Sequence, residues 1–342
     1  MNMNTTLADL LTEREVLLAD GATGTTFFAM GLEAGAAPEL WNVDAPEKVH
    51  ALHQGFVTAG SDIILTNSFG GSHYRLKLHD AHNRVEELNT AAAQCGRHVA
   101  DRAGRQVIVA GSIGPTGEIF EPVGSVTHEE GRIAFREQAK GLVKGGADVL
   151  WIETLSSTEE LKAAVEGASG LGVPIVATLS FDTNGRTMMG IAPEDWGGGI
   201  LTQLPAPLFA YGANCGAGLN ELAATMLAMK QNAAPDTVLV AKGNCGIPRF
   251  EDGEIVYDGT PELMAKYAQL VKAMGVQIIG GCCGTTKEHV AAMRQALDGY
   301  RPNTTELPDI QMIEDTLGVM KRSGADSNDK RKRSEGRRRR RG

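Results

Sequence analysis

The stretch VQIIGGCCG, residues 276–284, contains the pattern that decides the fold. A short apolar run ends in glycines and two adjacent cysteines, which is typical of a buried strand that stops at a sharp turn. Seven further apolar runs, each bounded by glycine or polar residues, lie at 15–21, 61–71, 106–115, 147–154, 173–181, 208–216 and 237–246. The sequence therefore predicts eight strands.

A segment with helical periodicity follows each predicted strand, from PEKVHALHQGFVTAG (46–60) to TKEHVAAMRQAL (286–297). Strands that read as continuous apolar runs are covered on both faces, as parallel strands with helical crossovers are. Eight such units predict an α/β protein with a (β/α)8 TIM barrel. An open doubly wound sheet is the alternative, because the sequence does not itself show that the sheet closes.

Charge divides the 342-residue chain, whose net charge is −9, into two unlike parts. From Lys321 onward there are eleven Lys and Arg against three Asp and Glu, so this tail carries about +8 and the rest about −17. We expect the barrel over residues 1–304 and a C-terminal extension over 305–342, basic and disordered from about residue 322. Because the folded body is acidic, we expect no nucleic-acid function.

The N-terminus has no basic region followed by an apolar stretch, and nowhere do 18 uncharged apolar residues run together. We therefore expect a cytoplasmic protein with no membrane partner, and nothing in the sequence excludes an oligomer. The five cysteines would stay reduced in the cytoplasm, which favours metal binding or catalysis over a disulfide framework.

The ends of the predicted strands carry polar and reactive residues. Active sites of (β/α)8 barrels lie at the C-terminal ends of the strands, so residues far apart in the sequence should meet at one mouth. The strand ends read Asp20-Gly21-Ala22, Thr66-Asn67-Ser68, Gly111-Ser112, Glu153-Thr154, Ser180-Phe181-Asp182, Asn214-Cys215, Gly243-Asn244-Cys245 and Cys282-Cys283.

Two of the cysteines, Cys282 and Cys283, are adjacent. Neighbouring residues of a regular strand point to opposite faces, so both thiols can bind one ion only where the backbone turns sharply. The flanking Gly280, Gly281 and Gly284 allow such a turn. We therefore expect both thiols to point toward one atom.

A third thiol, Cys215 at the end of the sixth predicted strand, should face the same mouth as Cys282 and Cys283. An all-sulfur ligand set favours zinc over magnesium or calcium, and three protein ligands leave one exchangeable position, which is the catalytic pattern. A zinc site of this kind lowers the pKa of a bound thiol and so implies attack by a substrate thiolate. The alternative is that these cysteines are small core residues, which is our interpretation of Cys95.

Several segments together resemble one family, the zinc-dependent homocysteine S-methyltransferases, over about residues 14–300. They are LADGATGT (18–25), TNSFGG (66–71), GSIGPTGE (111–118), IETLSSTEELKAA (152–164), GANCG (212–216) and GGCCGTT (280–286). Members transfer a methyl group to homocysteine to make methionine and have the barrel fold. The resemblance therefore implies a methyltransferase whose substrate is homocysteine and whose cofactor is Zn2+.

The resemblance implies that Cys215, Cys282 and Cys283 are the zinc ligands, and thereby the catalytic residues, with the homocysteine sulfur in the fourth position. Asn244 matches the family position whose side-chain oxygen fills that position when substrate is absent. From the residues alone, Cys245 beside it is an alternative fourth ligand.

The resemblance also implies the substrate-binding residues. Asp20 and Glu153 would hold the amino acid end of homocysteine, aided by backbone N–H groups near Gly21 and Ala22. Carboxylates at strand ends are natural partners for a substrate ammonium group. Asn67, at the end of the second predicted strand, completes the expected set.

The methyl donor divides the family. Betaine users surround the quaternary ammonium with aromatic rings, and Trp41 and Tyr74 are candidates for that role. The loop SFGG (68–71), however, has glycine where those enzymes carry an aromatic residue. The sequences of the motifs resemble more closely the homocysteine module of cobalamin-dependent methionine synthase. We therefore expect a separate methyl-corrinoid protein as the methyl donor, in a split synthase. Betaine and another small methylated donor are the alternatives.

Two functions of other classes also fit the sequence. A redox protein would form a vicinal disulfide between Cys282 and Cys283 and would hold no metal. A noncatalytic module that binds homocysteine or zinc would bind both without turnover.

Overall fold

The computed structural model describes residues 6–246, 248–251, 254–302 and 306–320. All eight predicted strands are present. They are β1 (Leu17–Leu18), β2 (Ile63–Leu65), β3 (Ile108–Ile113), β4 (Val149–Leu155), β5 (Ile175–Leu179), β6 (Ala210–Cys215), β7 (Leu239–Gly243) and β10 (Ile278–Gly281). They pair in parallel in the order β1-β10-β7-β6-β5-β4-β3-β2. A parallel bridge between Ala19 and Ile63 joins the two edge strands, so the predicted barrel is confirmed and the open sheet is excluded.

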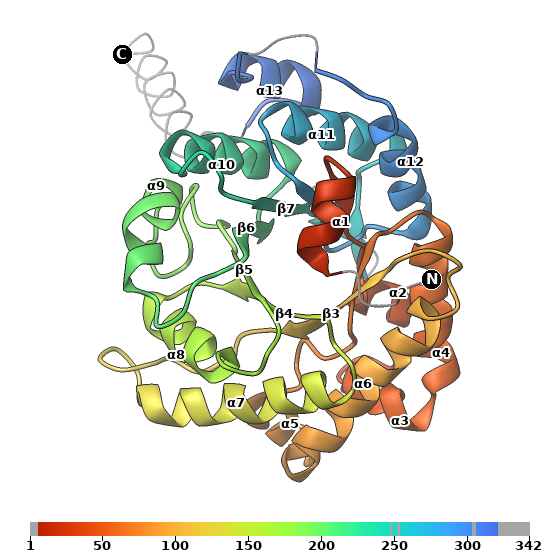
Figure 1. The fold of residues 1–342 in the computed structure, drawn as a ribbon, viewed down its shortest axis with the longest axis vertical. Coiled ribbons are helices and arrows are strands. Elements are labelled where there is room, and N and C mark those ends of the chain that lie inside the picture. The colour runs from red at the N-terminus through yellow and green to blue at the C-terminus, as the bar shows by residue number, and fades with distance from the viewer. Residues whose placement is uncertain (1–5, 247, 252–253, 303–305, 321–342) are drawn as a thin grey trace, which may run out of the picture.

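Helices surround the strands as an outer ring (Figure 1). The helices are α1 (Leu7–Glu13), α2 (Gly24–Ala29), α3 (Trp41–Asp44), α4 (Pro46–Thr58), α5 (His73–Lys77), α6 (Val85–Ala100), α7 (His128–Lys144), α8 (Thr158–Ala168), α9 (Pro193–Asp195), α10 (Leu219–Asn232), α11 (Pro261–Ala273), α12 (Lys287–Leu297) and α13 (Ile310–Leu317). Within the described part of the chain, none of them combines the length and the apolarity that a membrane span requires.

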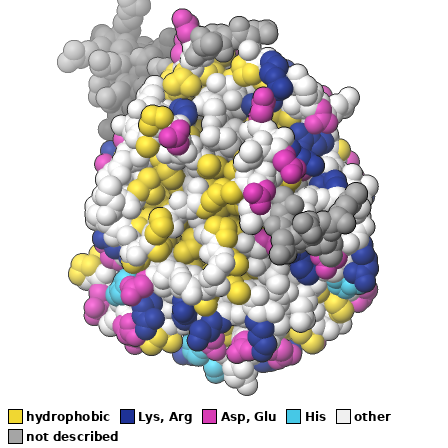
Figure 2. Space-filling model, in the orientation of Figure 1, with side chains coloured by type: hydrophobic (Ala, Val, Ile, Leu, Met, Phe, Trp, Pro, Cys, Tyr) yellow, Lys and Arg dark blue, Asp and Glu magenta, His cyan; other side chains and the backbone are white. Residues whose placement is uncertain are grey.

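One end of the barrel is closed by α1, which lies across it in Figure 1. A capping box between Thr6 and Asp9 begins this helix. Its Leu7 and Leu10 are buried against the first inward-facing residues of the strands, such as Ile63. In the same view, Figure 2 shows apolar side chains gathered toward the middle of the molecule and charged side chains mostly around its periphery.

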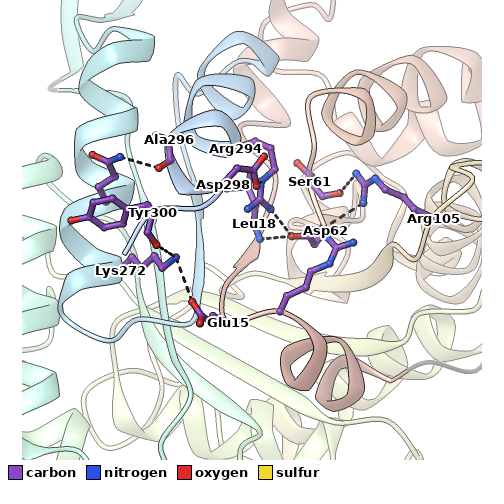
Figure 3. A network of polar contacts seen from close by, with 12 residues as sticks. Glu15, Leu18, Ser61, Asp62, Arg105, Lys272, Arg294, Ala296, Asp298 and Tyr300 are labelled. Atoms are coloured by element: carbon purple, nitrogen blue, oxygen red, sulfur yellow. Dashed lines mark hydrogen bonds and ion pairs between the residues drawn. The ribbon is translucent and has the colours of Figure 1, made fainter. Parts of the chain in front are cut away.

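Asp62 stabilises the seam where the barrel closes. Because β1 has only two residues, few ladder hydrogen bonds are available there. The Asp62 N–H donates to the Leu18 carbonyl at 2.6 Å, and the Leu18 N–H donates back to Asp62 Oδ2 at 2.9 Å. Arg14, Arg105 and Arg294 pair with the same fully buried carboxylate (Figure 3). One side chain thus ties together the first strand, the second strand and α12.

The inside of the barrel changes from apolar to polar along each strand. Trp151, Val176 and Val240 belong to the apolar interior. Since side chains alternate along a strand, the next inward positions are two residues further on. Those residues, Glu153, Thr178 and Lys242, are polar and buried. Ser112 on β3, Asn214 on β6 and Asp20 just after β1 are buried polar residues too. The buried polar side chains therefore lie at the C-terminal ends of the strands, where the sequence predicts the active site.

Two features outside the predicted strands complete the fold. An antiparallel hairpin, β8 (Pro248–Glu251) and β9 (Glu254–Tyr257), lies between β7 and α11, and the sequence did not predict it. In the expected C-terminal extension, α13 packs on α10 and α11 and buries Ile313. The domain boundary at residue 304 stays a prediction, and the basic run from about residue 322 lies outside the described residues.

Candidate metal and substrate site

The three expected thiols form one cluster. The Sγ atoms of Cys215, Cys282 and Cys283 lie within 4.8 Å of one another, although β6 and β10 are far apart in the sequence. All three are free thiols and partly exposed. Hydrogen bonds with Cys215 and Cys282 lower the pKa of Cys283, whereas hydrogen bonds with Cys282 and Cys283 raise the pKa of Cys215 and the pKa of Cys282 is also raised, so without a cation the cluster favours a single thiolate, at Cys283. Three sulfur donors facing one point are a set that a soft metal ion prefers.

The turns that carry the cysteines are strained or tightly packed. Cys215 has a φ of 61° and Gly284 a φ of 76°, both in the left-handed region. A non-glycine residue in this region costs roughly 1–3 kcal/mol, and such strain is concentrated at functional sites. The sequence predicted that Gly280 and Gly281 allow the turn, but only Gly284 has a positive φ among these three glycines.

Gly280 and Gly281 instead make room for neighbouring chain. A Cβ at Gly280 would lie 2.9 Å from Cβ of Ala19, and one at Gly281 would lie 2.2 Å from Cγ2 of Thr285. Both residues are part of β10. Their lack of a side chain therefore serves the close packing of this strand rather than the bend after it.

Asn244 joins the two cysteine-bearing turns. Its Nδ2 donates to the Gly216 carbonyl at 2.8 Å, and its Oδ1 accepts from the Cys283 N–H at 3.1 Å. The oxygen expected to approach a metal thus already binds the backbone. Cys245, the other candidate for the fourth position, is not part of the sulfur cluster found among the described residues. Its Sγ donates to the Gly259 carbonyl.

Cys95 lies apart from the sulfur cluster. It is buried on α6 and its Sγ faces the Asn42 carbonyl at 3.8 Å. Its position in the hydrophobic core fits the packing role expected for it.

Glu153 and Asp20 are both buried, but their surroundings differ. Glu153 Oε1 accepts from the Ser112 hydroxyl at 2.6 Å. Burial raises the pKa of Glu153 to about 7, and the nearby Lys242 opposes the shift. Asp20 has partners at both oxygens: Lys242 Nζ lies 2.9 Å from Oδ1, and the Leu65 N–H donates to Oδ2 at 2.7 Å. Lys242 was not among the residues expected at the site, although it is the next inward position after Val240.

Other expected substrate residues are committed to contacts within the protein. The Ala22 N–H donates to the Thr285 carbonyl at 2.9 Å, so it is not the free donor that we expected. A Cβ at Gly21 would lie 2.3 Å from the same carbonyl oxygen, so Gly21 is needed for this close contact. Asn67 donates to the Pro38 carbonyl at 2.7 Å and to Asn42 Oδ1 at 3.0 Å. These contacts fix the loops around the mouth.

The aromatic candidates differ in their surroundings. The Trp41 ring lies against Phe27, with centroids 5.1 Å apart, and Lys48 Nζ lies 4.0 Å from the Trp41 centroid. One cation is therefore already stacked on Trp41. Tyr74 contacts the neighbouring His73 edge to face.

A third aromatic residue, Tyr257, which was absent from our expectations, lies beside the sulfur cluster. A Cβ at Gly284 would lie 2.3 Å from Cγ of Tyr257, so this ring covers the turn after Cys283. Burial and a hydrogen bond with Cys283 raise the pKa of the Tyr257 hydroxyl. Tyr257 belongs to the unpredicted hairpin, so no strand-end pattern pointed to it.

Comparison with known proteins identifies the family of this chain. Residues 17–297 match the family described as homocysteine S-methyltransferase. The methionine synthase of Mycobacterium tuberculosis is 30% identical over 313 residues, which cover 86% of this chain and 25% of that protein. The methionine synthase of Mycobacterium leprae is 28% identical over 322 residues, which cover 87% of this chain and 26% of that protein. The chain thus spans about a quarter of the length of these relatives.

The fold also matches a solved structure. The metallated form of the homocysteine methyltransferase MmuM from Escherichia coli has a TM-score of 0.70 at 24% identity, with 84% of this chain and 99% of that chain covered. The matched barrel and the match over residues 17–297 confirm the resemblance seen in the sequence motifs. This chain belongs to the homocysteine S-methyltransferase family.

Proposed function

We propose that this protein is a zinc-dependent S-methyltransferase that makes methionine from homocysteine and a methyl donor. The observation that carries the proposal is the cluster of three sulfur atoms within 4.8 Å, beside the buried Glu153. Family membership and the similarity to proteins named methionine synthase support it.

The donor set fits zinc. Cys215, Cys282 and Cys283 would hold the ion, and three protein ligands leave one position for a substrate. When bound, zinc supplies positive charge that lowers the pKa of a coordinated thiol. A vicinal disulfide between Cys282 and Cys283 would not need the third thiol at Cys215, so the cluster supports the metal site over the redox alternative.

Glu153 is the proposed acceptor for the substrate ammonium. Lys242 is ion-paired with Asp20, so Glu153 is the buried acid of the polar interior that has no ion-pair partner among the described residues. Within the described residues, Ser112 is its hydrogen-bond partner, and it bonds to Oε1. A substrate ammonium at the other oxygen would balance the buried charge. Held there, the substrate would have its thiol directed to the sulfur cluster.

The chain's own residues then provide orientation. Asn244 holds the turns of Cys215 and Cys283 at a fixed separation, and Ser112 fixes the carboxylate of Glu153. Because the nucleophile is the substrate's own sulfur, the reaction needs no covalent enzyme intermediate, and positioning of the two reactants supplies the rate gain.

A methyl-corrinoid protein is the proposed donor, as part of a split methionine synthase. The similarity to proteins named methionine synthase supports a donor of this kind. Lys48 on the Trp41 ring disfavours betaine at that ring. A cytoplasmic location is part of the same proposal.

A donor screen tests the function. The zinc-loaded protein is incubated with homocysteine and, in turn, betaine, S-methylmethionine, free methylcobalamin and a methylated corrinoid protein, and methionine is quantified. We expect methionine with a corrinoid donor and little with betaine. Homocysteine binding without methionine from any donor would contradict catalysis and favour a noncatalytic binding module.

A further inference from the structure

Asn214 connects three strands at the mouth of the barrel. This fully buried residue lies on β6, one position before Cys215. Its Oδ1 accepts from the Thr154 N–H at 2.9 Å and from the Thr178 hydroxyl at 2.7 Å. Its Nδ2 donates to Thr154 Oγ1 at 2.7 Å and to Cys282 Sγ at 3.8 Å. A side-chain amide has two donors and two acceptor sites, and all four are in use.

On the β4 side, Asn214 supports an unusual backbone conformation. Thr154 has a φ of 65°, and the pairing register of β4 with β5 shifts between Ile152 and Leu155. A β-branched residue at positive φ is an outlier that persists only when its surroundings hold it. Asn214 binds both the N–H and the hydroxyl of Thr154. This bend directly follows Glu153 and so sets where that carboxylate lies.

On the β10 side, the same amide reaches a sulfur of the cluster. An N–H donor pointed at a cysteine sulfur stabilises negative charge there and fixes the direction of the side chain. The amide cannot turn away from Cys282 without breaking its bonds to Thr154, because Thr178 and the Thr154 N–H hold its oxygen. The positions of the sulfur and of the bend after Glu153 therefore depend on one rigid group.

We propose that Asn214 is a positioning residue that couples the metal site to the substrate site. Its amide holds Cys282 for the ion and, through Thr154, holds Glu153 for the substrate ammonium. The inference rests on the proposed function, since it assigns Asn214 a role toward the ion and the homocysteine of that reaction.

Asn214→Asp is the most direct variant. It keeps the size and both acceptor bonds but replaces the N–H donor by an oxygen facing Cys282 and Thr154. The matched control is Asn89→Asp, because Asn89 is equally buried and its Nδ2 also donates twice, to the Gly71 and Val85 carbonyls, away from any sulfur. Both variants lose a buried N–H donor, but only the donor of Asn214 faces the sulfur cluster.

Three quantities are measured: zinc affinity by competition with a chromophoric chelator, the sulfur-to-cobalt charge-transfer absorption of the Co2+-loaded protein, and homocysteine binding to the metal-loaded protein by calorimetry. We expect Asn214→Asp to weaken metal affinity by about 10- to 100-fold, the usual effect of removing a group that orients a ligand. We also expect a changed Co2+ spectrum and weaker homocysteine binding at saturating metal. Asn89→Asp should retain the metal affinity and the spectrum.

Wild-type metal affinity and an unchanged Co2+ spectrum in Asn214→Asp would overturn the inference. If that variant does not fold, Thr178→Val decides, because it removes one bond to the amide oxygen without touching Glu153 or the sulfurs. We expect it to weaken Co2+ binding measurably, and unchanged binding would equally overturn the inference. A wild-type protein that binds neither metal nor homocysteine would instead contradict the proposed function itself.

Discussion

Lys242 and Asp20 form an ion pair inside the barrel, with 2.9 Å between Nζ and Oδ1 and at most 3% of either side chain exposed. The family resemblance assigns the Asp20 carboxylate to homocysteine, and in the structure Lys242 is already its partner. The pair also places a cation between two buried acids, Asp20 and Glu153. The charges of these three side chains together determine whether the site can bind a further positive charge, from a proton or from a substrate.

We expect the stability of the fold to fall when only one partner of this ion pair is removed. Lys242→Met leaves Asp20 buried without its cation, and we expect a loss of about 3–5 kcal/mol in the free energy of unfolding, measured by urea denaturation. Asp20→Asn combined with Lys242→Met should recover most of that loss, because neither member of the pair is left without its partner. As a control, Lys144→Met breaks the exposed pair with Glu86 and should change stability little. Additive effects of the two buried substitutions would contradict the pairing.

Glu153 should recognise the amino group of the substrate. Glu153→Gln is expected to weaken homocysteine binding by about 10- to 100-fold, the loss of roughly 1.5–3 kcal/mol for a hydrogen bond to a charged group. Binding of 4-mercaptobutanoate, which has the thiol but no amino group, should change little. Calorimetry on the zinc-loaded protein gives both constants. Glu160→Gln is a suitable control, because Glu160 is also buried but bonds to Thr116. Equal losses for the two ligands in Glu153→Gln would argue against this role.

A buried histidine should make the fold sensitive to acid. His53 is fully buried on α4, neither ring nitrogen has a hydrogen-bond partner among the described residues, and burial lowers its pKa to about 4. The unfolded chain takes up the proton near pH 6.5 and the folded chain does not until about pH 4, so stability falls as the pH drops through this window. The loss should approach about 3 kcal/mol.

Urea denaturation at several pH values checks this prediction. His53→Leu should make the free energy of unfolding less dependent on pH between pH 6.5 and 4. Replacing the exposed His79 by glutamine should not have this effect. A wild-type profile without a slope in this range, or an unchanged slope in His53→Leu, would show that another group controls the acid response.

Much of the fold follows from the sequence because strand signals are local. The eight apolar runs and their polar ends indicated the barrel, and the position of cysteines at two of those ends indicated the sulfur cluster. The turn at Cys215, with its positive φ, was not foreseen, because nothing in GANCG marks a strained cysteine. The β8–β9 hairpin, which carries Tyr257, lacked a strong apolar run.

Local sequence patterns could not predict which side chains of different strands contact each other. The alternation of side chains shows that Lys242 and Asn214 face inward, but it does not show which side chains they meet. Those partners depend on how the strands are staggered around the closed barrel. The resemblance assigns Asp20 to the substrate, and its pairing with Lys242, 222 residues away in the chain, is seen only in the structure.

Zinc content of the purified protein and its cysteine variants tests the proposed metal site. We predict one zinc per chain in the wild type and in Cys95→Ala, whose sulfur lies in the α6 core, and loss of the metal in Cys215→Ala, Cys282→Ala and Cys283→Ala. Full zinc occupancy in Cys283→Ala, or a wild-type protein that binds no zinc when loaded under reducing conditions, would contradict the account.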